Sequence, residues 1–193
     1  MDPRASIPQV PLYLTSIVII SPSNAPLFVH SFTGEQDQMR HYHLGHAAVD
    51  VIEERISMTS MPTKPADSYL GLLFCMEDMA FYGFQTTTKL RMVLSVALVD
   101  AMIKDSDIVA IFRAIHHIIL TASQNPFLSL PPSFHAHSAD SSKEDPRRKL
   151  NTQVATSKMF LSGPEDLKPE WFKKSKAFND GIKAIGEMLK GGR

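Results

Sequence analysis

The sequence predicts an α+β fold in which a five-stranded, mainly antiparallel sheet is flanked by helices. Short runs of β-branched and aromatic residues come in a group of two and then a group of three, each bounded by turn-forming residues, and these predict strands. Longer segments after each group repeat apolar residues at the helical period. The expected order of elements is therefore β-β-α-β-β-β-α-α.

The first two strands form an N-terminal hairpin. Residues 14–20 contain the β-branched run IVII, which favours a strand. The segment SPSNAP at residues 21–26 is dense in turn formers. Residues 27–32 then resume the apolar pattern and predict the second strand.

A long amphipathic helix is expected at residues 37–60, ended by Met61–Pro62. Its apolar face repeats every fourth residue, at Leu44, Ala48, Ile52 and Ile56, with Ala47 and Val51 beside them. Its opposite face carries polar residues, namely His43, His46, Asp50, Glu53 and Glu54. Arg55 falls on the apolar arc, so its guanidinium must either reach solvent or meet a partner.

The second group of strands begins with YLGLLFCMEDMAFYGFQTTTK at residues 69–89. The acidic pair Glu77–Asp78 separates two aromatic-rich apolar runs, which predicts a hairpin with a tight turn. Residues 89–97 predict the fifth strand. Cys75 is the lone cysteine, and its place in an apolar strand predicts a buried, inert thiol.

Two further helices complete the fold. One is expected at residues 106–123, capped by Asp105 or Ser106. The other is expected at residues 169–189, with Trp171 and Phe178 on its apolar face and Gly181 and Gly186 each weakening it by about 1 kcal/mol. We interpret residues 1–13 as a flexible extension and residues 14–193 as one domain with a disordered insertion at 129–168.

Composition narrows the function. The chain has 20 Lys+Arg and 20 Asp+Glu, so it lacks the basic footprint that nonspecific nucleic-acid binding needs. The start of the sequence lacks the features of a secretory signal, and the strongly apolar stretch 12–20 is shorter than the roughly 20 residues of a membrane-spanning helix. We expect a soluble, cytosolic protein.

No pattern in the sequence predicts catalysis or a cofactor. The nucleophile, phosphate-loop and dinucleotide motifs are missing from the sequence. His43 and His46 share a helix face, but two histidines without a third ligand are a weak metal signal. We therefore expect no enzyme activity, no cofactor and no metal. The basic final helix, with Trp171 and Phe172 beside three lysines, either packs on the sheet or lies on an anionic membrane, and packing is the favoured interpretation.

Five segments of the sequence carry a resemblance to a known family: SIVIISPSNAPLFVHS, HAAVDVIEERIS, SYLGLLFCMEDMAFYGFQTTTK, IFRAIHHIILTASQNPF and SKAFNDGI. Together they resemble the sedlin family of TRAPP vesicle-tethering subunits, which have a longin-like fold, and the resemblance is greatest to the 2-like branch of that family. They cover roughly residues 14–130 and 170–189. The resemblance is absent from residues 1–13 and 129–168.

The resemblance implies a non-catalytic assembly or adaptor subunit that contacts other TRAPP subunits. The assembled complexes promote nucleotide exchange on Rab GTPases in transport from the endoplasmic reticulum to the Golgi and within the Golgi, so a cytoplasmic, peripheral location at those membranes is implied, with membrane contact through other subunits. The alternatives are a stand-alone longin domain that regulates SNAREs and a peripheral membrane binder.

Helices on one face of the sheet would leave its other face, or an edge strand, for a partner. The expected partner-binding residues lie on the two long helices and are Asp50, His43, Glu53, Glu54 and Arg113. Asp50 is the foremost candidate because it matches the family motif. The competing interpretation is that Asp50 caps or pairs locally.

Overall fold

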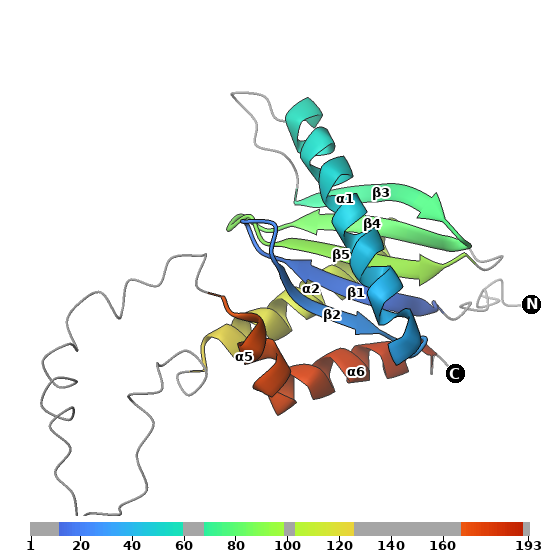
Figure 1. Cartoon of the computed structure of the whole chain (residues 1–193). Helices are drawn as coiled ribbons and strands as arrows, with labels where there is room; N and C mark the ends of the chain where they lie inside the picture. The colour runs from blue at the N-terminus through green and yellow to red at the C-terminus, as the bar shows by residue number, and fades with distance from the viewer. Residues whose placement is uncertain (1–11, 60–67, 99–102, 126–166, 191–193) are drawn as a thin grey trace, which may run out of the picture.

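The computed structural model describes residues 12–59, 68–98, 103–125 and 167–190 (Figure 1). Most of the predicted extension at 1–13 and of the predicted insertion at 129–168 lies outside the described residues. The treatment of 14–193 as one domain therefore stays a prediction.

A five-stranded antiparallel sheet organises the described residues, which confirms the predicted α+β class. Its strands are β1 (Leu14–Ile20), β2 (Pro26–Ser31), β3 (Tyr69–Met76), β4 (Met79–Gln85) and β5 (Arg91–Ala97). The spatial order is β2-β1-β5-β4-β3, and every neighbouring pair is antiparallel. The two sequence groups of strands therefore meet where β1 pairs with β5, and β2 and β3 form the edges.

Helices cover both faces of this sheet (Figure 1). A short 3-10 turn, Glu35–Asp37, leads into α1 (Gln38–Thr59), which crosses one face. The other face carries α2 (Asp105–Ser123), α5 (Pro169–Lys174) and α6 (Lys176–Lys190). The expectation that helices occupy one face and leave the other free is wrong, because β1 and β5 have apolar side chains pointing both ways.

Two apolar cores follow from that alternation. Beneath α1, Val18 and Ile20 of β1 pack with Ala48 and Ile52. Behind the sheet, the intervening residues of β1 join a larger cluster that includes Phe112 of α2 and three residues of the C-terminal helices. The members from β1 and those helices are Leu14, Ile17, Ile19, Phe172, Phe178 and Ile182. Each face of β1 thus buries a different set of residues.

α1 reaches both edges of the sheet with a side chain. At its first turn, Gln38 Nε2 donates to the Val29 carbonyl of β2, 2.9 Å away. Near its last turn, Arg55 donates to the Leu70 carbonyl at 2.5 Å and the Leu73 carbonyl of β3 at 3.4 Å. These bonds satisfy carbonyls on the edge strands, which would otherwise be open to another chain. These carbonyls are also the hydrogen-bond partners that Arg55 needs, because its position on the helix faces the apolar side.

The C-terminal segment forms two helices where one was expected. Ser175 has extended backbone angles (φ −76°, ψ 103°), which end α5. Its hydroxyl accepts the Phe178 N–H at 3.2 Å, as an N-cap does for a new helix. Asn179 Nδ2 joins the two helices by donating to the Phe172 and Ser175 carbonyls at 2.9 and 2.8 Å. The bend buries Phe172, and Trp171 is only half-buried, so the expected place of Trp171 on the core face is wrong.

The prediction that Asp105 or Ser106 caps α2 is also wrong. The residue before α2 is Lys104, and no side chain caps the helix there. Asp105 instead accepts a hydrogen bond from the Tyr69 hydroxyl at 2.9 Å, which ties α2 to β3. Burial, the Asp105 hydrogen bond and the Asp105 charge raise the pKa of Tyr69 well above its usual range.

Within the described ranges, α2 is the one helix that is long and apolar enough to cross a membrane by length and composition alone. That criterion is also met by helices that pack in a protein core. Ile108, Phe112 and Ile115 of α2 are fully buried beside the sheet, so this helix belongs to the larger core cluster.

Candidate functional site

The outer face of α1 holds the foremost predicted residue. His43, Asp50 and Glu54 are all exposed there, as their opposition to the buried Ala48 and Ile52 predicts. Asp50 makes no hydrogen bond or ion pair with any residue that the structure describes. This geometry favours a carboxylate available to a partner over one engaged in a local cap or pair.

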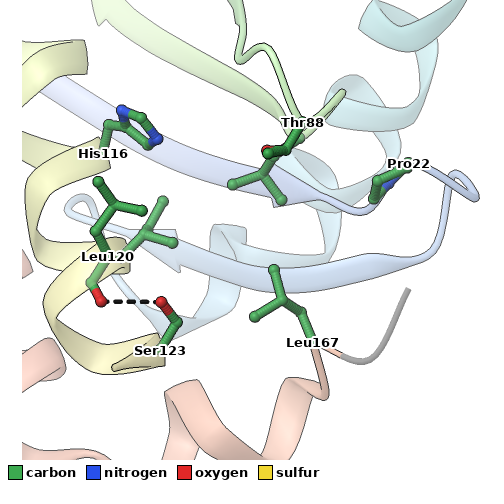
Figure 2. Close-up of a pocket in the computed structure, with 8 residues that line it drawn as sticks. Pro22, Thr88, His116, Leu120, Ser123 and Leu167 are labelled. Carbon is green, nitrogen blue, oxygen red and sulfur yellow. Dashed lines mark hydrogen bonds between the residues drawn. The ribbon is translucent and has the colours of Figure 1, made fainter. Parts of the chain in front are cut away.

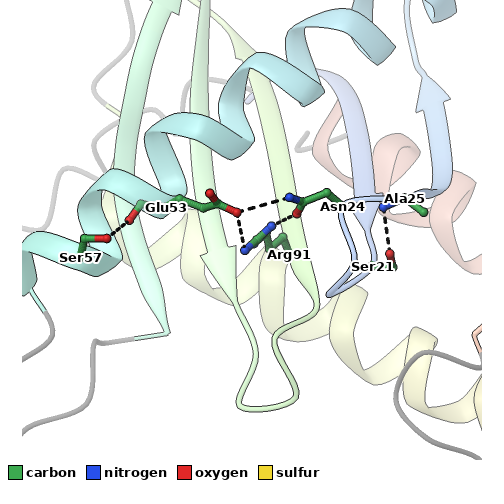
Figure 3. Close-up of polar contacts among 6 residues, drawn as sticks. All are labelled: Ser21, Asn24, Ala25, Glu53, Ser57 and Arg91. Carbon is green, nitrogen blue, oxygen red and sulfur yellow. Dashed lines mark hydrogen bonds and ion pairs between the residues drawn. The ribbon is translucent and has the colours of Figure 1, made fainter.

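Glu53, one turn further along, is engaged inside the domain (Figure 3). Its carboxylate lies 3.0 Å from a guanidinium nitrogen of Arg91, which is nine-tenths buried on β5. Asn24, in the turn between β1 and β2, accepts from the same guanidinium and donates to Glu53 at 3.4 Å. Glu53 thus joins α1, β5 and the first hairpin, which is a positioning role.

The histidine-rich start of α1 divides between core and surface. His41 is buried with its Nδ1 unpartnered, and burial lowers its pKa, with Asp37 opposing and Arg40 adding to the shift. His43 and His46 both pack their rings on Tyr42, with centroids 5.5 and 4.7 Å away. Among the described residues no three His, Cys, Asp or Glu side chains converge into a group able to hold a metal.

Arg113 lies away from the other predicted residues, on α2 and therefore on the opposite face of the sheet. Its side chain is exposed and lines an open pocket of about 420 Å³ with Tyr69, Phe84, Thr87 and His116. The structure thus places four of the five predicted residues on α1, with Glu53 paired to Arg91, and the fifth, Arg113, on α2.

Several residues that shape these surfaces were not identified from the sequence. Arg91 sits in a strand of otherwise apolar and small residues, and such a buried cation is itself a signal of a required partner. Arg40 of α1 forms an ion pair with Glu77 of the β3–β4 turn, which fixes the start of α1 over that hairpin. Cys75 is exposed on the edge strand β3, so the prediction of a buried thiol is wrong.

The chemistry open to these surfaces is recognition. The carboxylates of Asp50 and Glu54 accept hydrogen bonds and attract cations, while the Arg113 guanidinium donates to carboxylates. Among the described residues, the groups with a shifted pKa are buried or half-buried, namely His30, His41, Tyr69 and Tyr82.

In the described part of the chain, an antiparallel five-stranded sheet has one helix on one face and three on the other, and exposed charged side chains lie on α1 and α2. This arrangement defines the class of longin-like α+β domains. The chain belongs within it to the sedlin family, because a family model described as Sedlin matches residues 19–157, more than half of its length.

Curated relatives support the same family, and the three described below are among those named trafficking protein particle complex subunit 2-like protein. The one from Dictyostelium discoideum is 31% identical over 117 residues, which cover 59% of this chain and 81% of the relative. The one from Taeniopygia guttata is 31% identical over 125 residues, covering 64% and 89%. The one from Bos taurus is 32% identical over 112 residues, covering 58% and 80%.

Proposed function

We propose that this protein is a non-catalytic assembly subunit of a TRAPP vesicle-tethering complex and that it contacts a neighbouring subunit through the outer face of α1. Family membership and the names of the curated relatives support the assembly role. In this proposal the assembled complex, rather than this chain, promotes nucleotide exchange on a Rab GTPase. The complex acts in transport between the endoplasmic reticulum and Golgi and within the Golgi, with this subunit on the cytoplasmic side.

The observation that carries the site is the state of Asp50. It is an exposed carboxylate with no partner among the described residues, next to the exposed Glu54 and His43. Neighbouring Glu53 is by contrast committed to Arg91. A free carboxylate on a rigid helix suits a cationic or hydrogen-bond-donating group of another subunit, since a rigid element loses little conformational entropy on binding.

Native co-purification tests this function. The tagged chain should elute far above its own 21.5 kDa and bring down other small subunits of the complex. Asp50→Ala should reduce recovery of one adjoining subunit by about tenfold or more, as expected when a central charged contact of about 1.4 kcal/mol or greater is lost. Elution as a free monomer with no co-purifying subunits would contradict the proposal.

A conservative pair of variants separates contact from folding. Asp50→Asn keeps the size of the side chain and removes its charge, whereas Glu54→Gln makes the same change one turn away. If both variants retain every subunit, the outer face of α1 is not the contact surface, although the assembly role can still hold.

The packing of α5 and α6 argues for membrane contact through other subunits. Phe172, Phe178 and Ile182 are at most 1% exposed, because they pack against the sheet and α2. A helix that lies on a lipid surface needs an apolar face free for insertion. Flotation of the purified chain with anionic liposomes, lost at high salt, would favour the peripheral-membrane alternative.

A further inference from the structure

Two pockets lie next to one another along α2, and His116 lines both. One is the 420 Å³ pocket that contains Arg113. The other has a volume of about 170 Å³ and is lined mainly by apolar side chains, including Pro22, Leu120 and Leu167 (Figure 2). We call this pair of pockets the α2 groove. It runs between α2 and the turns that precede β2 and β5.

The first half of the α2 groove presents an unneutralised cation. Arg113 forms no ion pair within the described part of the chain. His116 follows it by three residues, so the two side chains share one side of the helix. Asp105, an acid two turns earlier on α2, is already bonded to the Tyr69 hydroxyl.

The second half of the groove presents an exposed apolar surface. Leu120 is 44% exposed and lines this pocket together with Pro22 and Leu167. In Figure 2, Leu120 and His116 stand on one wall, Thr88 and Pro22 on the other, and Leu167 closes the lower side. An apolar side chain placed here would remove Leu120 and Leu167 from water.

The dimensions fit a short peptide segment. The residues of α2 that line the groove run from Val109 to Ser123, a helical rise of roughly 21 Å. An extended chain of about six residues spans that length. The ligand chemistry at the two ends differs, since Arg113 calls for a carboxylate and Leu120 for an apolar group.

We infer that the α2 groove binds a peptide segment of another subunit, with an acidic side chain at Arg113 and an apolar side chain at Leu120. This inference rests on the proposed function as an assembly subunit. It adds a second contact surface, on the face of the sheet opposite Asp50. Charge complementarity at Arg113 selects an acidic segment over a basic one.

A zero-length crosslink in the native complex tests the polar end. Arg113→Lys places an amine at the groove, and a water-soluble carbodiimide joins that amine to a carboxylate in contact as an amide, with the carbodiimide taking up the oxygen as a urea. Mass spectrometry should find the crosslink on an Asp or Glu of another subunit, with an apolar residue about three positions away, since Arg113 and Leu120 are about 10 Å apart along the helix axis. His117→Lys, exposed on the same helix but outside the groove, is the matched control and should give no such crosslink.

A synthetic peptide of the crosslinked segment tests both ends. It should bind the full chain, and Arg113→Ala and Leu120→Asp should each weaken its dissociation constant by about tenfold or more. Replacing the acidic residue of the peptide with the matching amide should weaken its binding to the native chain by the same factor. The same replacement should change its binding to the Arg113→Ala chain little further. Both positions are exposed, so the variants should keep the melting temperature of the native chain, which shows that folding is not the cause.

Three results overturn the inference. One is a crosslink only to carboxylates of this chain itself, which would make its own sequence the occupant. Another is a crosslink pattern identical to that of His117→Lys while other subunits co-purify, which removes the groove and leaves the proposed function standing. The third is failure of the unaltered chain to co-purify with any subunit, which removes both.

Discussion

Two acidic residues three positions apart on α1, Asp50 and Glu53, have different roles although both are exposed. Glu53 neutralises Arg91, a cation that the packing of β5 has removed from water. Asp50 forms no ion pair with any of the described residues. The distinction rests on what lies beneath each residue and is not visible in the pattern of charges along the helix.

This difference predicts opposite effects on stability. Glu53→Ala should lower the free energy of unfolding by about 1 kcal/mol, because it leaves the buried Arg91 guanidinium with only Asn24, while the half-exposed carboxylate limits the loss. Asp50→Ala should change it by less than about 0.5 kcal/mol. Urea denaturation curves measure both. Equal losses would mean that Asp50 also supports the fold.

The buried His41 and the half-buried His30 predict a loss of stability in acid. Burial lowers the pKa of His41 and of His30, with Lys183 adding to the effect at His30. Well above pH 6.5, the ordinary pKa of histidine, both are neutral in the folded and the unfolded chain, so they add no pH dependence there. As the pH falls through this pKa, the unfolded chain binds protons that the folded chain does not, so the contribution of these two groups lowers the free energy of unfolding.

Urea denaturation at about pH 7.5 and about pH 5.5 measures this decrease. His41→Leu should make it smaller, because one of the two responsible groups is gone. His43→Ala, an exposed position on the same helix, should leave it unchanged. A decrease of the same size in all three proteins would assign the acid sensitivity to other groups.

At the scale of elements, the approach of α6 to β2 depends on a missing side chain. A Cβ at Gly186 would overlap the ring of Phe32, whereas a Cβ at Gly181 would lie 3.1 Å from the flexible end of Ile118. The two glycines weaken the isolated helix equally, by about 1 kcal/mol each. The two positions differ in how closely a neighbouring side chain packs against the glycine.

Gly186→Ala should therefore destabilise the protein by about 1–2 kcal/mol despite its better helix propensity, since overpacking a fixed ring outweighs the gain. Gly181→Ala should have a smaller effect, because the end of Ile118 can move by the few tenths of an ångström required. Differential scanning calorimetry of the two variants gives the comparison. A more stable Gly186→Ala protein would show that α6 can shift away from β2.

The edge contacts of α1 make a further prediction. Arg55→Ala removes two hydrogen bonds to β3 carbonyls, so the free energy of unfolding should fall by about 1–3 kcal/mol and the edge should become open to pairing. Concentration-dependent association, measured by light scattering, should increase in this variant. Arg55→Lys keeps one charged donor and should behave between the native chain and Arg55→Ala. An unchanged scattering curve would mean that other groups protect the edge.

Elements with a strong period were predictable from the sequence, and their ends and surroundings were less so. The bounds of β1 and nearly all of α1 and α2 agree with the predictions, because burial on one face imposes the period. The break at Ser175 was missed because a serine within an apolar period looks like a solvent-facing helix residue. Its capping role depends on Phe172 and Phe178 packing together, with rings 4.9 Å apart.

For the candidate site, the sequence predicted which residues are exposed but not which of them pair within the domain. The exposed side of α1 follows from periodicity, so Asp50 and Glu54 were identified as surface residues. The engagement of Glu53 was not, since Arg91 comes close only when β5 pairs with β1. Cys75 was misjudged because an edge strand has the same local composition as a central one, and strand order is a property of the whole sheet.

At the scale of the whole molecule, α5 and α6 behave as part of the same core. Phe172, Phe178 and Ile182 complete the cluster that contains Phe28 and Phe112. We therefore expect a chain truncated before residue 169 to lose its cooperative thermal transition, because several fully buried aromatic and aliphatic side chains would vanish from one cluster. Near-ultraviolet circular dichroism during heating measures this. A retained sharp transition would place these helices outside the folding unit, against the proposal of one domain from residue 14 to 193.

The diagonal placement of α1, tied to β2 by Gln38 and to β3 by Arg55, also sets a geometry for assembly. Because the helix is held at both ends, we expect Asp50 to keep a constant separation from Arg113 on the far side of the sheet. If both proposed surfaces bind neighbouring subunits, the domain is a spacer of constant thickness between them. The thickness of this small sheet and its covering helices would then set the distance between two subunits in the assembled complex.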